Sequence, residues 1–182
     1  MPKSRKVVVH IATTADSFIA RSNGELDWLT SRPAPQGFYG ISEFIQSVDT
    51  KVLGRKTYES SVRLGAKFDD GFRYIVFSHH PRPAEAPPRV EFVSGIRSFV
   101  DSLTEQPGKD IWLMGGGEVI TSFLEQQAID EFIVTVFPLF LGDGIPLIAR
   151  RDLHVPLKLE RAQSFDNGVV QLHYLVEKNG RH

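Results

Sequence analysis

The sequence predicts an α/β fold, a three-layer sandwich in which helices cover both faces of a mainly parallel central sheet. Short β-branched apolar runs alternate along the 182 residues with stretches whose apolar side chains recur at helical spacing, and this alternation is typical of parallel sheets. Two of the apolar runs end abruptly in glycine just before a helical pattern. Near the C-terminus, Asp166-Asn167-Gly168 separates two strand-like segments, which predicts a terminal antiparallel pair.

The first half of the chain is expected to contain three strands and two helices. A long loop follows the first strand and carries several large apolar residues, so it should fold over the core or over a flat ligand. The expected strands are 6–13, 51–53 and 73–78, the loop is 14–29, and the helices are 41–48 and one that starts near residue 54.

The second half is expected to continue the alternation and then to close with the antiparallel pair. A loop rich in glycine and proline precedes this pair, and the first strand of the pair alternates only weakly between apolar and polar residues. The expected strands are 90–93, 111–114, 131–138, 157–164 and 169–177, the helices are 95–103 and 116–127, and the loop is 139–148.

Composition excludes several classes of protein. The formal net charge of −1 gives no basic field for nucleic acid. The chain has no cysteine, so disulfides, thiolate catalysis and cysteine-based metal sites are excluded. The apolar run after the basic residues 1–6 is too short for a signal peptide, and no stretch approaches the ~18 apolar residues of a membrane span. We therefore expect a cytoplasmic protein of one domain, residues 1–182, with neither nucleic acid nor a membrane as partner.

Familiar catalytic motifs are also missing from the sequence. Neither glycine-containing junction fits the Walker pattern or GxGxxG, which argues against a P-loop and against a standard Rossmann site. The sequence contains no HExxH or other metal-ligand spacing, so no metal site is expected. It contains no G-x-S-x-G elbow to mark a hydrolase nucleophile.

The two junctions of strand, glycine and helix carry the strongest functional signal. They are Gly54-Arg55-Lys56-Thr57 and Gly115-Gly116-Gly117-Glu118. A helix N-terminus attracts anions, and ligands of parallel sheets lie beyond the C-terminal ends of the strands. Two helix N-termini at the ends of parallel strands suit a molecule with separated phosphates, such as a dinucleotide. The alternative is a pair of ordinary turns without a ligand, although cations in a first helical turn oppose the helix dipole.

Further cationic and polar residues stand at the end of strand 73–78. If Ser78, His79 and Arg82 lie near Arg55, the cluster suits a ribose 2′-phosphate, and the cofactor would be NADP rather than NAD. For His79, an equally good interpretation is an ordinary residue of the polar loop before Pro81, without a ligand. His10, alone within an apolar strand, is expected to be a packed, hydrogen-bonded core residue without a catalytic role.

Five motifs follow one another over nearly the whole chain. The first two are Ala12…Asp16-Ser17-Phe18-Ile19-Ala20…Gly24…Asp27-Trp28 and Asp49-Thr50…Leu53-Gly54-Arg55-Lys56-Thr57-Tyr58-Glu59. The others are Ile75-Val76-Phe77-Ser78, Met114-Gly115-Gly116-Gly117 and Val134-Thr135…Pro138…Leu141-Gly142-Asp143-Gly144-Ile145-Pro146-Leu147. In this order they resemble the dihydrofolate reductase fold superfamily. The most similar branch is the RibD C-terminal family, the reductase domain of bifunctional riboflavin-biosynthesis proteins.

This resemblance implies NADPH as cofactor and indicates the residues that would hold it. Arg55 would lie near the 2′-phosphate, and Ala12 and Ile19 would contact the nicotinamide. The residues implied to hold phosphates are Gly54, Arg55, Lys56 and Thr57. Those implied to lie beside the adenine and its ribose are Phe77, Ser78 and His79. At the end of strand 111–114 and the helix start after it, the residues implied to lie at the pyrophosphate are Met114, Gly116, Gly117, Glu118, Val119 and Ile120.

The substrate side departs from the pattern of dihydrofolate reductases. Those enzymes carry an acidic residue in the first helix, and here Phe38 or Tyr39 stands at about that position. Glu43, one turn further on, is a possible substitute that does not match the pattern. Asp27, in the loop, is the candidate acidic catalytic residue, with ordinary surface charge as its alternative, and Thr135 matches a pocket threonine of the fold.

The expected function is therefore NADPH-dependent reduction of a small nitrogen heterocycle, pterin-like or pyrimidine-like, by hydride transfer. One alternative is the 5-amino-6-(5-phosphoribosylamino)uracil reductase of riboflavin biosynthesis. Another is a nucleotide-binding protein that has lost catalysis. The segments 139–148 and 169–177 would give a monomer more exposed apolar surface than is usual. Because relatives of this branch are also commonly dimers, a homodimer is expected.

Overall fold

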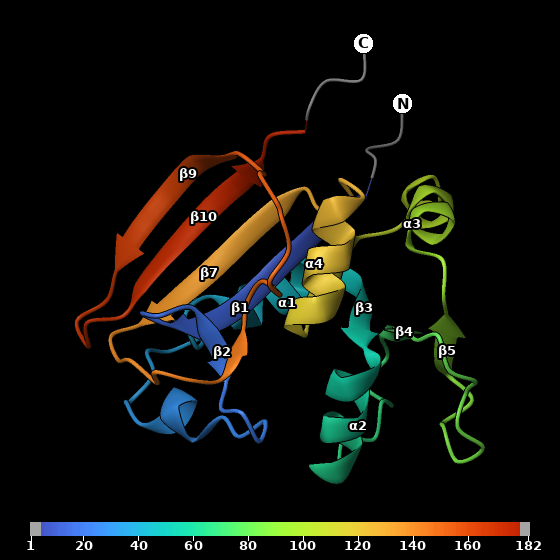
Figure 1. The fold of residues 1–182 in the computed structure, drawn as a ribbon, viewed down its shortest axis with the longest axis horizontal. Helices are drawn as coiled ribbons and strands as arrows, with labels where there is room; N and C mark the ends of the chain where they lie inside the picture. Colours follow the sequence, from blue (N-terminus) through green and yellow to red (C-terminus); the bar gives the residue numbers. More distant parts are fainter. Residues whose placement is uncertain (1–4, 179–182) are drawn as a thin grey trace.

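Eight strands form one sheet in this computed structural model, which describes residues 5–178. Along the chain these strands are β1 (Val7–Thr14), β3 (Val48–Gly54), β4 (Arg73–Phe77), β5 (Val90–Val93), β6 (Asp110–Gly115), β7 (Glu131–Phe137), β9 (Leu157–Ser164) and β10 (Val170–Val176). Their order across the sheet is β5-β4-β3-β6-β1-β7-β10-β9 (Figure 1). The pairs from β5 to β7 are parallel, whereas β10 is antiparallel to β7 and to β9. The predicted fold class is confirmed.

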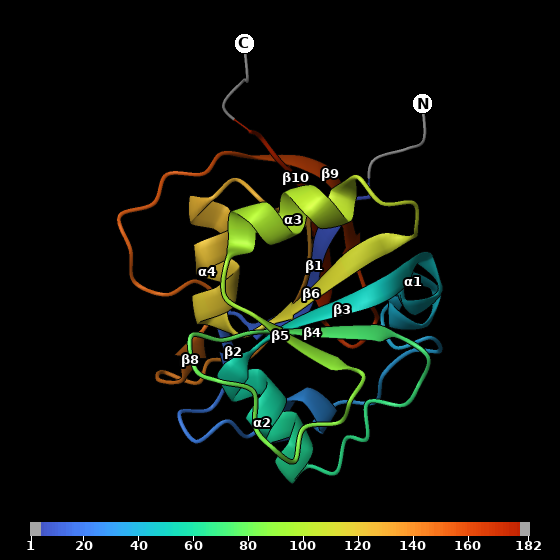
Figure 2. The same ribbon diagram turned by 90° about the vertical axis from the view of Figure 1, so that its right-hand side faces the viewer.

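Helices lie on both faces of this sheet (Figure 2). They are α1 (Ile41–Ser47), α2 (Arg55–Arg63), α3 (Ile96–Thr104) and α4 (Gly117–Glu125), with a short 3-10 helix at Asp27–Thr30. Side chains of α3 and α4 pack on one face, whereas Tyr58 of α2 and Phe44 of α1 pack on the other. Within residues 5–178, none of the helices is long and apolar enough to cross a membrane.

The loop expected over residues 14–29 is more ordered than its sequence suggests. It contains β2 (Phe18–Ala20), which pairs with β8 (Ile145–Pro146), and it also contains the 3-10 helix. Both short strands lie in segments that were expected to be loops, and they form because segments far apart in the sequence meet. Trp28 is buried against Phe137 at the end of β7, so this loop does fold over the core.

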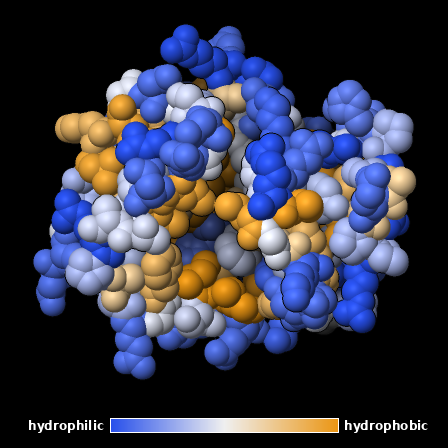
Figure 3. All heavy atoms as spheres, turned by 90° about the horizontal axis from the view of Figure 1, so that it is seen from below, coloured by the Kyte–Doolittle hydropathy of each residue, from blue (hydrophilic) through white to orange (hydrophobic). Residues whose placement is uncertain are grey.

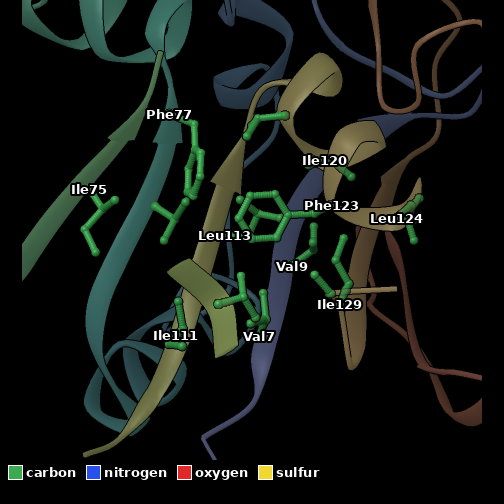
Figure 4. Packing of buried hydrophobic residues seen from close by; sticks show 14 of the residues in the cluster. Val7, Val9, Ile75, Phe77, Ile111, Leu113, Ile120, Phe123, Leu124 and Ile129 are labelled. Atoms are coloured by element: carbon green, nitrogen blue, oxygen red, sulfur yellow. The ribbon is translucent and has the colours of Figure 1, made fainter. Parts of the chain in front are cut away.

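The face under α3 and α4 has one continuous hydrophobic core. Phe123 and Ile120 of α4 and Leu103 of α3 share one cluster with side chains from five neighbouring strands, β4, β3, β6, β1 and β7; part of this packing is shown in Figure 4. Phe123 is 1% exposed and lies edge-on to Phe77, with 5.1 Å between ring centroids. Burial of this many large side chains makes this face the main source of hydrophobic stabilisation.

The opposite face has its hydrophobic residues in two separate clusters. One cluster lies around Tyr58, Phe68 and Tyr74, and the other around Trp28, Tyr39, Phe137 and Val169. Met114 of β6 packs at the edge of the first cluster, and Ala12 of β1 packs at the edge of the second. Because β1 and β6 are neighbouring strands, the core of this face divides between these two side chains.

Candidate functional site

The predicted site residues come from four neighbouring strands that end at the same edge of the sheet. β4, β3, β6 and β1 are adjacent and parallel, and Gly54 is in register with Phe77 while Leu53 is in register with Gly115. Seen from this edge, the surface is hollowed near its centre, and hydrophobic side chains border the hollow (Figure 3). The hollow lies where ligands of parallel sheets are bound.

The two predicted helix starts converge at this edge. A Cβ atom added to Gly54 would lie 3.7 Å from the backbone nitrogen of Gly116, and one added to Gly116 would lie 3.3 Å from Thr57 Oγ1 and 3.9 Å from Ile19 Cδ1. The N-cap residues are Gly54 and Gly116, which have no side chain to accept from the first N–H groups of α2 and α4. The N–H groups of two first helical turns are therefore directed to one place, where they favour an anion.

Gly117 allows α4 to begin close to the loop that contains β8. A Cβ atom at Gly117 would collide with the carbonyl oxygen of Pro146 and would lie 3.2 Å from that of Leu147. The peptide bond between Gly115 and Gly116 is cis. Glycine at position 117 is thus required by backbone packing, whether or not a ligand is bound.

Arg55 connects the first helix start to the end of β4. Its guanidinium group donates to the carbonyl oxygen of Pro81 at 3.0 Å and to Ser78 Oγ at 3.4 Å, and its Nε pairs with Glu59 at 2.6 Å. It also lies over the ring of Phe92, 5.6 Å from the centroid. The end of β4 therefore adjoins Arg55 through Ser78 and Pro81, whereas Arg82 donates instead to the carbonyl oxygens of Ala86 and Pro87.

The other predicted cofactor residues are distributed around the same edge. Ser78 Oγ accepts from the backbone N–H of His80 and donates to its carbonyl oxygen, each at 3.0 Å, which shapes the turn after β4. Glu118 pairs with Arg151 at 3.0 Å and faces solvent. Lys56 and His79 are exposed, Ala12, Ile19, Thr57, Met114 and Gly116 are half-buried, and Phe77, Gly117, Val119 and Ile120 are buried.

Thr135 lies in a buried polar network that sequence reasoning missed. Its Oγ1 accepts from Gln171 Nε2 at 2.9 Å, and the same nitrogen donates to the carbonyl oxygen of Tyr39 at 2.8 Å. Ala12, Thr135 and Gln171 are in register across β1, β7 and β10. The network connects Tyr39, just before α1, to β7 and β10 at the position where β7 pairs with Ala12 of β1. The polar Gln171 within the mostly apolar strand β10 was the signal that could have revealed it.

His10 is a core residue, as expected from the sequence. It is 7% exposed, its ring packs 4.8 Å from that of Phe44, and its Nε2 lies 3.4 Å from Gln171 Nε2. Burial, with a smaller contribution from His173, lowers the pKa of His10 to about 4. The imidazole is therefore neutral at pH 7, and its Nδ1 has no hydrogen-bond partner among the described residues.

The structure does not bring Asp27 together with Thr135. Asp27 is exposed at the start of the 3-10 helix, and both of its oxygens accept from Arg21, at 2.6 and 2.9 Å. The hydrogen bond from Arg21 lowers the pKa of the Asp27 carboxyl despite some desolvation. A catalytic role for Asp27 stays a prediction, and an ionised, arginine-paired carboxylate is poorly suited to donate a proton.

A left-handed turn occupies the position where the acidic residue was sought. Gly37, Phe38, Tyr39 and Gly40 all have positive φ, at 75°, 46°, 58° and 81°. This conformation disfavours Phe38 and Tyr39 by about 1–2 kcal/mol each. Asn167 holds the turn by donating to Tyr39 Oη at 2.6 Å, and the ring of Phe38 is left partly exposed. The Glu43 carboxylate packs on this turn, 3.3 Å from where a Gly37 Cβ would lie.

Comparison with known proteins connects this geometry to one family. The family model described as the RibD C-terminal domain matches residues 5–171. Two Bacillus subtilis (strain 168) proteins, both described as uncharacterized, are similar along most of their length. YwjB is 40% identical over 174 residues, covering 94% of this chain and 98% of its own. YyaP is 32% identical over 185 residues, covering 94% of this chain and 95% of its own.

Solved structures show the same fold. A putative riboflavin biosynthesis protein from Shewanella sp. PV-4 has a TM-score of 0.83 and 26% identity, covering 95% of this chain and 99% of its own. A dihydrofolate reductase from Enterococcus faecalis, complexed with NADP(H) and RAB-propyl, has a TM-score of 0.69 and 15% identity, covering 95% of this chain and 97% of its own. A bifunctional deaminase and 5-amino-6-(5-phosphoribosylamino)uracil reductase from Thermotoga maritima has a TM-score of 0.70 and 19% identity, covering 96% of this chain and 57% of its own.

Proposed function

The chain belongs to the RibD C-terminal domain family, and from this premise we propose that it is an NADPH-dependent reductase. The proposed reaction is hydride transfer to a small nitrogen heterocycle, pyrimidine-like or pterin-like. The observation that carries the proposal is the convergence, beside Arg55, of two helix N-termini that begin at glycines. This arrangement offers separate places for the anionic groups of a dinucleotide.

The residues present fit the phosphates of NADPH. The start of α4, from Gly116 to Ile120, would hold the pyrophosphate through backbone N–H groups. The start of α2 would hold the adenosine side, with Arg55 and Ser78 as donors to the 2′-phosphate. Ala12 and Ile19 would contact the nicotinamide. A bound NADPH would supply the hydride, and the protein would supply placement and exclusion of water.

The substrate would enter where the hydrophobic core of the sheet face divides. Ala12 and Met114 belong to different clusters, and the substrate ring would lie at this division, against the nicotinamide that Ala12 contacts. The buried network of Thr135 and Gln171 forms polar structure beside Ala12. The partly exposed Phe38, held in its left-handed turn, is a candidate wall of this pocket because Tyr39 next to it is bonded to Gln171.

The choice of cofactor tests the proposal directly. Arg55→Ala is expected to raise the Kd for NADPH about 10- to 100-fold, because charge-assisted hydrogen bonds contribute about 1.5–3 kcal/mol. The Kd for NADH, which lacks the 2′-phosphate, should change little. Arg63→Ala, at the exposed C-terminal end of the same helix, is the matched control and should alter neither value.

Two results would contradict the proposal. One is an Arg55→Ala variant that loses NADPH and NADH affinity equally, because the side chain would then not recognise the 2′-phosphate. The other is a wild-type protein that binds no NADPH at near-millimolar concentration, which would exclude both enzyme interpretations. Both titrations can be followed by the fluorescence of the reduced nicotinamide.

Substrate assays distinguish the finer alternatives. Family membership favours 5-amino-6-(5-phosphoribosylamino)uracil as a candidate substrate, and the similarity of fold makes dihydrofolate the natural comparison. NADPH consumption with the aminouracil would identify the riboflavin-pathway activity. NADPH binding without consumption in either assay would favour the nucleotide-binding protein that has lost catalysis.

A further inference from the structure

Asp16 stands in the first of the family motifs, and the proposed reaction gives it no part. Its half-buried carboxylate accepts hydrogen bonds from two separate loops. Oδ2 accepts from the backbone N–H groups of Gly142 at 2.8 Å and Leu141 at 3.0 Å, and Oδ1 accepts from Thr14 Oγ1 at 2.5 Å. Despite some desolvation, the bonds from these three groups lower the pKa of the Asp16 carboxyl, which is therefore ionised at pH 7. The charge strengthens each of the bonds.

The turn that carries Asp16 has a conformation that local preference disfavours. Ser17 has a φ of 65°, in the left-handed region that residues other than glycine seldom adopt. The N–H of Ser17 donates to the carbonyl oxygen of Thr14 at 2.9 Å, and that of Phe18 donates to Thr14 Oγ1 at 3.1 Å. Because Thr14 Oγ1 also donates to Asp16, the carboxylate holds this turn and sets the direction in which the chain enters β2.

The position of β2 depends on this junction of two loops, because β2 does not belong to the large sheet. Within residues 5–178, β2 pairs with β8 in a separate two-stranded sheet (Figure 1). Gly144, just before β8, packs so closely on β2 that a Cβ atom there would collide with the carbonyl oxygen of Ala20. After β8, the N–H of Leu147 donates to the carbonyl oxygen of Ser17 at 2.9 Å. Asp16 therefore joins both ends of the small sheet's connection to loop 139–147.

β2 carries Ile19, which is proposed to contact the nicotinamide. Ile19 Cδ1 lies 3.9 Å from the position that a Cβ atom of Gly116 would have. The start of α4 at Gly116 does not need Asp16, because Ile120 and Phe123 anchor this helix in the continuous core. The place of Ile19 against α4 is therefore the part of the site that depends on Asp16.

We propose that Asp16 is a positioning residue, which fixes β2 so that Ile19 contacts the nicotinamide half of the cofactor. This inference rests on the proposed function. A carboxylate suits the role because donors face both of its oxygens, whereas an amide would direct its NH2 group toward one of these donors. A loop contact with no such role would change stability alone, or would change the affinity for every part of the cofactor equally.

Titrations with NADPH and with adenosine 2′,5′-bisphosphate separate the two halves of the cofactor. The bisphosphate carries the adenine, its ribose and the 2′-phosphate but no nicotinamide. Asp16→Ala is expected to raise the Kd for NADPH at least about fivefold and to change that for the bisphosphate less than about twofold. Asp16→Asn, which keeps one acceptor oxygen, should have an intermediate Kd for NADPH. Asp152→Ala removes an exposed carboxylate and is the matched control, which should alter neither value.

Amide hydrogen exchange tests the junction without any cofactor. The N–H of Ala15 donates to the carbonyl oxygen of Leu139 at 2.9 Å, and that of Leu147 donates to Ser17. In Asp16→Ala both amides should exchange at least about tenfold faster than in the wild type, because the junction opens locally. The amides of β3, which lies in the large sheet, should exchange at the wild-type rate.

Unchanged exchange at Ala15 and Leu147 would overturn the proposal. An Asp16→Ala variant that keeps its NADPH affinity would also overturn it, as would one that loses affinity for NADPH and the bisphosphate equally. A wild type that binds neither ligand would instead contradict the proposed function, and with it the role toward the nicotinamide. The exchange rates would then still decide whether Asp16 fixes β2.

Discussion

The two faces of the central sheet differ in how their hydrophobic residues are joined. Under α3 and α4 one cluster extends without a break from β4 to β7, whereas the face under α1 and α2 has two clusters with Ala12 and Met114 at their facing edges. The continuous face can be expected to supply stability. The divided face carries the predicted site residues Ala12 and Met114, and we place the proposed cofactor site at the gap between its two clusters.

Removing a large side chain from the continuous core should have the largest effect on stability. Phe123→Ala is expected to lower the free energy of unfolding by about 3–5 kcal/mol, since it leaves a cavity among fully buried neighbours. Phe140, 79% exposed, provides the matched control: Phe140→Ala should stay within about 0.5 kcal/mol of wild type. Urea denaturation measures both, and equal losses would contradict the importance given to the continuous core.

The buried His10 on the divided face should make stability depend on pH. The folded protein protonates His10 only near pH 4, whereas the unfolded chain takes up this proton near the ordinary value of 6.5. Stability should therefore fall as pH decreases from 6.5 to 4, by about 2 kcal/mol at pH 5. His10→Gln should remove this part of the slope, and His154→Gln, at an exposed position, should retain it. Unfolding at pH 7 and 5 measures the slope; identical slopes in wild type and His10→Gln would contradict the assignment.

Filling the gap should affect binding more than stability. Ala12→Phe places a ring between the two clusters and should raise the Kd for NADPH at least about tenfold, about 1.4 kcal/mol. It should leave the free energy of unfolding nearly unchanged. Val9→Phe, on the same strand but facing the continuous core, should instead cost about 1–3 kcal/mol of stability through overpacking. An Ala12→Phe variant with wild-type NADPH affinity would show that the gap is not the cofactor site.

The sequence was informative wherever structure depends on neighbouring residues. The junctions at Gly54 and Gly116 could be located because a strand, a glycine and a helix pattern follow one another directly. Their convergence depends on β3 and β6 being neighbours in the sheet, which no local pattern specifies. The length of β3 was also underestimated. The expected strand was 51–53, whereas β3 begins at Val48, directly after α1, and ends at Gly54.

Features built from distant segments could not be derived in this way. β2 exists only because it meets β8, more than a hundred residues later. The network of Thr135, Gln171 and the Tyr39 carbonyl oxygen joins three separate regions. The left-handed turn at Phe38 contradicts local preference and is held by a contact from Asn167. The proposed substrate side of the site depends on these features, whereas the proposed phosphate side depends mainly on local motifs.

The most direct measurement of the central claim is a titration of the labelled protein with NADPH, followed through its backbone amide resonances. If both helix starts bind one NADPH molecule, the amides of residues 55–57 and 117–119 should shift together and saturate at the same cofactor concentration. Saturation with shifts confined to the continuous face, or at only one of the two helix starts, would contradict it.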